Sequence, residues 1–155
     1  MLHRTLANPD ERDAANGIYN RTKSINHPRL LKVGELDEWE GQLYFTEEDF
    51  EGNSLRKTLQ DVQNGGRQLA IREAAQIVLQ ILKALSAAHD NDFVFRALRP
   101  EHMLVNIKYT GPRKTTFVAQ VKLSGLGFWD LVPSGTLAED EFSKGEAQYL
   151  APELM

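Results

Sequence analysis

Residues 71–89 read IREAAQIVLQILKALSAAH and carry the clearest structural signal in the chain. Apolar side chains recur three and four positions apart, the spacing that places them on one face of an α-helix. Because they are all alanine or branched aliphatics, we expect a helix that packs this stripe against a core, with no cofactor implied. The stripe consists of Ala74, Ile77, Val78, Ile81, Leu82, Leu85 and Ala88.

Strand-like segments follow this helix. Residues 93–95, 103–109 and 115–123 are rich in β-branched, aromatic and other apolar side chains, which favour strands. Residues 110–114, with the sequence TGPRK, combine glycine and proline. We therefore expect a turn that joins the last two strands into a hairpin.

The segments before the helix mix helical and strand signals. Asn8 followed by Pro9 is typical of a helix start, and we expect that helix to run toward Asn26. The succession of helix, strands, helices and hairpin predicts the α+β class. The other expected elements are strands at residues 30–33 and 42–46, an acidic turn at 34–41 and a short helix at 54–62.

The composition excludes several classes of protein. The chain has 155 residues, of which 41% are hydrophobic and 26% charged, and its formal net charge is −4. This length suits one domain, and the charge gives no basic footprint for nucleic acid or anionic lipid. Cysteine is absent, so a disulfide framework and a thiolate metal site are excluded. No apolar run approaches the ~20 residues that span a bilayer. We predict a cytoplasmic protein without nucleic-acid or membrane partners.

Three segments in fixed order resemble motifs of the Ser/Thr protein kinases of the bacterial, eukaryotic-like type. Residues 95–102, FRALRPEH, are similar to the catalytic loop H-R-D-L-K-P-E-N. Residues 121–127, VKLSGLG, resemble the strand that leads into D-F-G, and residues 145–153, GEAQYLAPE, resemble G-T-x-x-Y-x-A-P-E. Several such motifs in register are specific, whereas one alone is weak.

The resemblance implies a partial protein-kinase-like fold. It would contain αC, strands β4–β5, αD, αE, the catalytic-loop hairpin and the activation segment of that family. Residues 1–48 would be the remnant of the small lobe, and residues 49–155 the first half of the large lobe. The same resemblance places the glycine-rich loop and the ATP-binding lysine before Met1, and the rest of the large lobe after Met155.

The resemblance also identifies lost chemistry. The catalytic-loop aspartate corresponds to Ala97, the metal-binding asparagine to His102 and the D-F-G aspartate to Gly125. The αC glutamate falls nearest Ile18. A methyl group accepts no proton, imidazole is a poor ligand for Mg²⁺, and glycine has no side chain. We therefore expect no kinase activity, no metal and no nucleotide cofactor.

Other family positions keep their physical character. Phe95 and Leu126 replace aromatic or imidazole side chains with apolar groups suited to packing. Arg99 keeps the positive charge of the family's lysine, and Arg96 matches an arginine that grips an activation-loop phosphate in the family. Three hydroxyl residues in the activation-segment equivalent are candidate phosphorylation sites for another kinase. They are Ser134, Thr136 and Ser143.

The family's gatekeeper position aligns with Glu47. A carboxylate that faces an adenine pocket is costly to bury without a partner, and it repels triphosphate. In the alternative register, Glu47 and Asp49 both point into solvent. The sequence leaves these two readings open.

These residues predict a pseudokinase fragment that acts as a non-catalytic scaffold and binds protein partners. Two alternatives stay open. One is a degenerate Ser/Thr kinase that keeps weak ATP and Mg²⁺ binding, and the other is a truncated product with no independent function.

Overall fold

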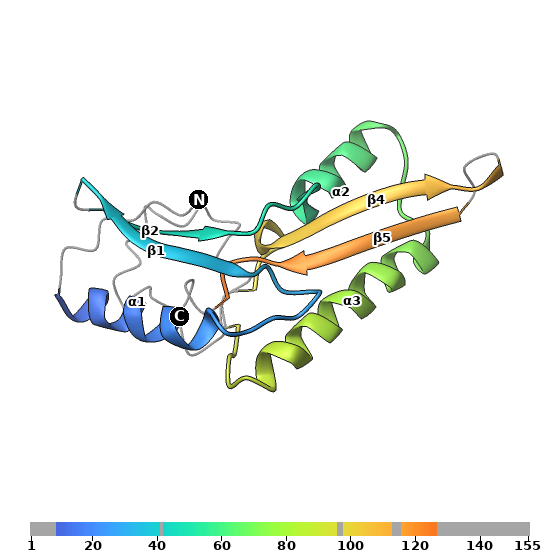
Figure 1. Cartoon of the computed structure of the whole chain (residues 1–155). Coiled ribbons are helices and arrows are strands. Elements are labelled where there is room, and N and C mark those ends of the chain that lie inside the picture. Colours follow the sequence, from blue (N-terminus) through green and yellow to red (C-terminus); the bar gives the residue numbers. More distant parts are fainter. Residues whose placement is uncertain (1–8, 41, 96–97, 113–115, 127–155) are drawn as a thin grey trace, which may run out of the picture.

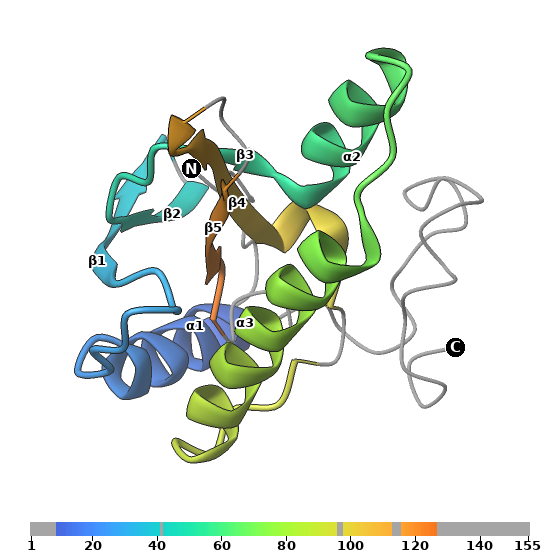
Figure 2. The same cartoon turned by 90° about the vertical axis from the view of Figure 1, so that its right-hand side faces the viewer.

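The computed structural model describes residues 9–40, 42–95, 98–112 and 116–126. In this part the chain forms an α+β fold with two antiparallel sheets, one of two strands and one of three. Figure 1 shows the longest helix running along the three-stranded sheet and the first helix running along the two-stranded one. Figure 2 shows both later helices on the side of the larger sheet away from the smaller one.

The first half of the chain supplies one helix and the smaller sheet. Helix α1 (Pro9–Thr22) precedes strands β1 (Val33–Trp39) and β2 (Gln42–Glu47). The two strands pair from Val33↔Glu47 to Trp39↔Gln42, with a register shift between Val33 and Leu36. Val33 and Phe45 are buried together in a small apolar cluster, against which α1 packs.

The prediction for this region was wrong in three respects. The strand expected at residues 30–33 is not formed, because β1 begins at Val33 and Leu30 makes only an isolated bridge to Leu123. The first helix ends at Thr22 and not near Asn26, while its expected cap at Asn8 lies outside the described residues. The acidic stretch at 34–41 was expected to form a turn, but most of it belongs to strand β1. Its charges do not prevent a strand because β1 is an outer strand, so Glu35, Asp37 and Glu38 lie exposed to solvent.

The second half contains the larger sheet. A short strand, β3 (Asn53–Ser54), pairs with β4 (Met103–Thr110), and β4 pairs with β5 (Thr116–Leu123). The β4–β5 hairpin is in register from Met103↔Leu123 to Thr110↔Thr116, which confirms the predicted hairpin. The strand predicted at residues 93–95 is not formed; instead Phe93 is a buried anchor, only 4% exposed.

Two helices link β3 to the hairpin. Helix α2 (Leu55–Asn64) begins after Ser54, whose side-chain oxygen accepts a hydrogen bond of 3.2 Å from the Lys57 N–H. Helix α3 (Ile71–His89) has the predicted bounds. Its buried face is narrower than predicted, because Val78 and Leu82 are more than half exposed. The residues that α3 buries are Ile77, Ile81, Ala84 and Ala88.

The main core lies between α3 and the hairpin. It includes Val121, Leu123 and Leu126, each at most 2% exposed, and reaches Ile25 and Leu30 from the loop after α1. The loop joins β5 through backbone hydrogen bonds: Leu31 N–H donates to Leu123 O at 2.8 Å and Leu123 N–H to Arg29 O at 2.9 Å. The end of β5 is therefore fixed from both sides.

Candidate functional site

Three of the predicted site residues, His102, Gly125 and Glu47, lie around the end of β5. Leu123 is fully buried, and the next residue, Ser124, donates its backbone N–H to His102 O at 2.9 Å. Gly125 follows with a φ of +70°, in the left-handed region that favours glycine. The positions that the resemblance assigns to two metal ligands, His102 and Gly125, are thus joined through Ser124.

Glu47 lies against this corner. The residue ends strand β2, and its side chain is half-buried rather than directed into solvent. Its carboxylate accepts a hydrogen bond from the Ser124 hydroxyl (Oγ–Oε2, 2.7 Å) and another from the Gly125 backbone N–H (N–Oε1, 2.7 Å). Of the two readings, the solvent-facing one is therefore wrong for Glu47, while Asp49 is exposed as that reading expected.

The electrostatics of Glu47 follow from this position. Burial raises the pKa of the Glu47 carboxyl, because an ionised carboxylate loses hydration there. The hydrogen bonds from Gly125 and Ser124 act in the opposite direction without cancelling the effect of burial. The two donors therefore satisfy the oxygens of Glu47 but do not fully replace water.

The neighbouring carboxylate behaves differently. Burial acts to raise the pKa of Glu48, but the ammonium group of Lys122 and the backbone N–H of Lys32 hold it below its ordinary value. Lys122 forms an ion pair with Glu48, and Lys32 N lies 3.2 Å from the same carboxylate oxygen, Oε1. Glu47 thus connects β2 to the end of β5 through hydrogen bonds, and Glu48 connects them through an ion pair.

The short helical turn before β4, with Arg99 at its start, holds the catalytic-loop equivalent His102. It spans Pro100–His102 as a 3-10 helix, in which His102 N–H donates to Arg99 O at 3.0 Å. His102 is 3% exposed, whereas Arg99 is half-buried. Glu101 forms an ion pair with Arg56 of α2. The imidazole at 102 is therefore a core component of this turn.

Several predicted positions are apolar packing residues. Ile18, expected nearest to the αC glutamate, packs against both apolar clusters. Phe95 packs against the main core, and Leu126 is part of it. The remaining predicted site residues lie outside the described residues. They are Arg96, Ala97, Ser134, Thr136 and Ser143.

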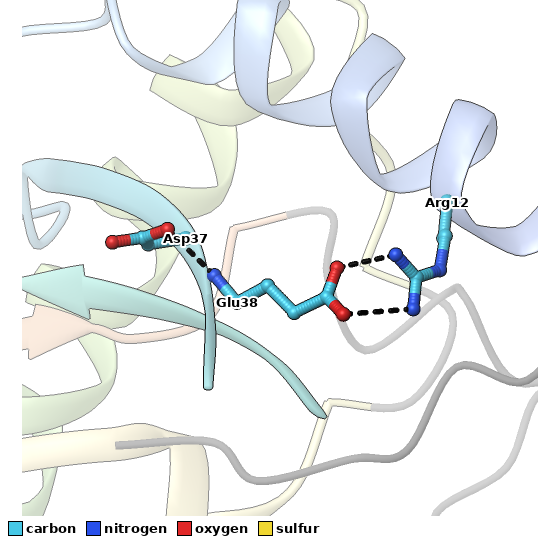
Figure 3. A network of polar contacts seen from close by, with 3 residues as sticks. All are labelled: Arg12, Asp37 and Glu38. Atoms are coloured by element: carbon cyan, nitrogen blue, oxygen red, sulfur yellow. Dashed lines mark hydrogen bonds and ion pairs between the residues drawn. The ribbon is translucent and has the colours of Figure 1, made fainter. Parts of the chain in front are cut away.

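The acidic strand β1 does not assemble a metal centre. Figure 3 shows Glu38 facing Arg12 of α1, with the Glu38 Oε1 accepting a hydrogen bond of 3.1 Å from Nη2. This hydrogen bond and the charge of Glu38 raise the pKa of Arg12. Asp37 Oδ1 accepts the Glu38 backbone N–H at 2.8 Å. Over the residues that the structure describes, no three histidine or acidic side chains gather closely enough to hold a metal ion.

Sequence reasoning identified Glu47 but missed its partners. Ser124 has no signature of a functional residue, and it lies 77 positions away from Glu47. The pairing of Lys122 with Glu48 spans a similar distance in sequence. No short-range pattern encodes such contacts, because they depend on how the two sheets meet.

Comparison with known proteins defines the class. The family model described as the protein kinase domain matches residues 7–155, so the chain belongs to the protein kinase domain family. It is 27% identical over 129 residues to the probable serine/threonine-protein kinase PknB of Lactococcus lactis, covering 83% of this chain and 18% of that protein. It is also 27% identical over 130 residues to PrkC of Bacillus subtilis, covering 84% of this chain and 18% of that protein.

Solved structures agree on the fold. The crystal structure of the Mycobacterium tuberculosis PknI kinase domain superposes with a TM-score of 0.62 at 19% identity, covering 80% of this chain and 46% of that chain. The chain therefore spans less than half of a solved kinase domain and less than a fifth of its curated bacterial relatives. Within the described residues, no helix has both the length and the apolar character of a membrane span.

Proposed function

We propose that this chain is a catalytically inactive member of the protein kinase family that works by binding another protein. The observation that carries the proposal is the Glu47–Gly125 contact. Gly125 stands where the resemblance puts the metal-binding aspartate of D-F-G, and its N–H donates to Glu47 at 2.7 Å. Gly125 has no side chain to hold a metal ion, and the carboxylate next to it belongs to Glu47 of β2.

Phosphoryl transfer requires positive charge around the transferred group. Kinases provide it with Mg²⁺, held by an aspartate and an asparagine, and with a lysine on the phosphates. Here the equivalents are Gly125 and His102, and the nearby cation, Lys122, is paired with Glu48. The charge of Lys122 is therefore compensated by Glu48, and Glu47 adds an acidic group that does not attract a triphosphate.

The proposed role as a scaffold is also supported by what the chain retains. Its core between α3 and the β4–β5 hairpin includes Leu126, which replaces the phenylalanine of D-F-G, and Phe95, which replaces the histidine of the catalytic loop, packs against that core. Packing is therefore preserved at places where the chemistry is not. The sequence adds one further reason to propose an inactive chain, because Ala97 stands where the resemblance puts the catalytic-loop base.

A thermal melt of the chain with and without millimolar ATP, in Mg²⁺ and again in EDTA, tests the proposal. We expect a cooperative transition whose midpoint ATP does not move. A ligand at ~100 times its dissociation constant stabilises a protein by about 2.7 kcal/mol, so binding would be visible. A midpoint raised by ATP only with Mg²⁺ would instead support a degenerate kinase, and the absence of any transition would support a product without independent function.

A further inference from the structure

A cleft of about 470 Å³ lies away from the Glu47 corner, between the loop that follows α1 and the second half of α3. It is lined by residues from 24–29 on the loop and from 83–91 on the helix side. In Figure 1 this loop passes next to the middle of α3 before it enters β1. The volume lies in the range of ordinary ligand sites, ~300–1,000 Å³.

The backbone carbonyl acceptors at the helix side of the cleft are already occupied. The last carbonyl groups of a helix lack partners within the helix and give its end a negative character. Here Ser86 O accepts the Asp90 N–H at 2.9 Å, and Ala88 O accepts the Asn91 N–H at 3.0 Å. The Asn91 side-chain amide donates to Ala87 O at 2.8 Å. The helix end therefore offers few unsatisfied acceptors to a ligand.

The donors of the cleft, by contrast, are available. Lys83 is exposed and makes no hydrogen bond or ion pair with any other described residue. One guanidinium nitrogen of Arg29 donates a hydrogen bond to the Gln80 side-chain oxygen, and the other terminal nitrogen bonds to no described residue and is left for a ligand. His27 accepts the Arg29 N–H on Nδ1 at 3.3 Å, so a neutral ring carries its proton on Nε2.

The charge of the cleft is opposite in sign to that of the chain. Of the described residues that line it, Lys83, Arg29 and His27 are basic, and Asp90 carries the one carboxylate. The formal net charge of the whole chain is −4. Long polyanions such as nucleic acid extend beyond the ~8 Å screening length and would meet the negative remainder of the surface. A short anionic group would interact mainly with the positively charged side chains of the cleft.

We propose that this cleft binds an acidic peptide segment of a protein partner, whose carboxylates accept hydrogen bonds from Lys83, Arg29 and His27. The inference rests on the proposed function in one respect, because it names the kind of partner that the non-catalytic module binds. Two or three neighbouring carboxylates match the number of donors, and the cations Lys83 and Arg29 outnumber the single carboxylate of Asp90, which would repel an acidic residue placed beside it.

The test measures fluorescence anisotropy of a labelled peptide with the central sequence Glu-Asp-Glu, titrated with the full chain. Lys83→Glu should weaken binding about tenfold or more, because it replaces attraction by repulsion. Lys57→Glu is the control: it makes the same charge change at an exposed lysine of α2 that lies outside the cleft and pairs with Asp61. The control should bind within about twofold of the unchanged chain.

Two further measurements sharpen the result. A peptide with Gln-Asn-Gln in place of Glu-Asp-Glu should bind at least about tenfold more weakly, and Lys83→Gln should weaken binding less than Lys83→Glu does. Circular dichroism melts of each variant establish that it is folded. The proposal would be overturned if both peptides bound equally well, or if the Lys83→Glu variant bound the acidic peptide as tightly as the unchanged chain. It would also be overturned if inorganic phosphate at the same concentration as the acidic peptide displaced that peptide completely.

The two proposals fail separately. An ATP-dependent rise in the melting midpoint would contradict the proposed loss of catalysis, and it would leave the anisotropy result standing. Absence of acidic-peptide binding would overturn the cleft assignment while the ATP result stands by itself.

Discussion

The carboxylate of Glu47 accepts the backbone N–H of Gly125 at 2.7 Å, although the two residues are 78 positions apart in the chain. This contact joins the end of β2 in the smaller sheet to the second residue after β5 in the larger sheet. It also places a half-buried acid where the resemblance to kinases puts the approach to nucleotide. Stability and backbone geometry at this corner therefore depend on one hydrogen bond.

Glu47→Gln should stabilise the fold at neutral pH. Burial raises the folded-state pKa of Glu47 above its ordinary value of 4.5. The stability associated with its protonated form is thus fully present below the unfolded-state pKa and is lost as pH rises through the folded-state pKa. The glutamine keeps an acceptor for Gly125 and offers an amide donor to the Ser124 oxygen, without a buried charge.

Chemical unfolding of both forms across pH 4 to 8 checks this prediction. The advantage of the glutamine variant should grow as pH rises. Glu47→Ala is the matched comparison, and it should lose ~1–3 kcal/mol of unfolding free energy, because the Gly125 N–H is then left without its acceptor. A glutamine variant that is less stable than the unchanged chain at every pH would contradict the account.

Gly125→Ala and Gly17→Ala should change stability in opposite directions. Gly125 has a φ of +70°, and an L-residue in that region costs ~1–2 kcal/mol. Gly17 lies inside α1, where an added Cβ would meet nothing within 4 Å. There alanine should gain ~0.5–1 kcal/mol. Urea unfolding of the two variants gives the signs, and a neutral Gly125→Ala would show that the backbone at this corner relaxes.

Gln80→Ala should destabilise the contact between α3 and β5. The Gln80 side chain donates to Ala119 O at 2.7 Å and accepts the Val121 N–H at 3.1 Å. Its removal leaves backbone groups at the covered edge of β5 unsatisfied, at a cost of ~1–3 kcal/mol. Gln76→Ala, at an exposed position of the same helix, is the control and should change the unfolding free energy little. Equal losses in both variants would refute this role for Gln80.

Ser54→Ala should weaken α2. Ser54 caps that helix through its contact with the Lys57 N–H, and loss of such a cap costs ~1 kcal/mol. Ser54→Asp should retain most of the stability, because aspartate caps equally well. Amide hydrogen exchange of the first turn of α2 measures the effect locally, and unchanged protection in the alanine variant would count against the cap.

Local patterns predicted much of the fold. The α3 bounds and the β4–β5 hairpin were anticipated because each is specified by a short-range signal, a 3.6-residue period in one case and a turn between strand-formers in the other. The acidic strand β1 was missed because its strand character comes from pairing with β2 and not from its own propensity. The width of the buried face of α3 was overestimated, because the spacing of apolar residues does not show how much of that face is covered by other elements.

The sequence by itself determined the family resemblance and the α+β class, because each depends on residue identity or local order. Tertiary structure alone decided that Glu47 turns inward, that Lys122 pairs with Glu48 and that Lys83, Arg29 and His27 share a cleft. Those contacts depend on how chain segments that are far apart in sequence pack against one another in the folded state. The burial and hydrogen bonding that fix a side chain's charge and direction exist only once the two sheets and α3 have packed together.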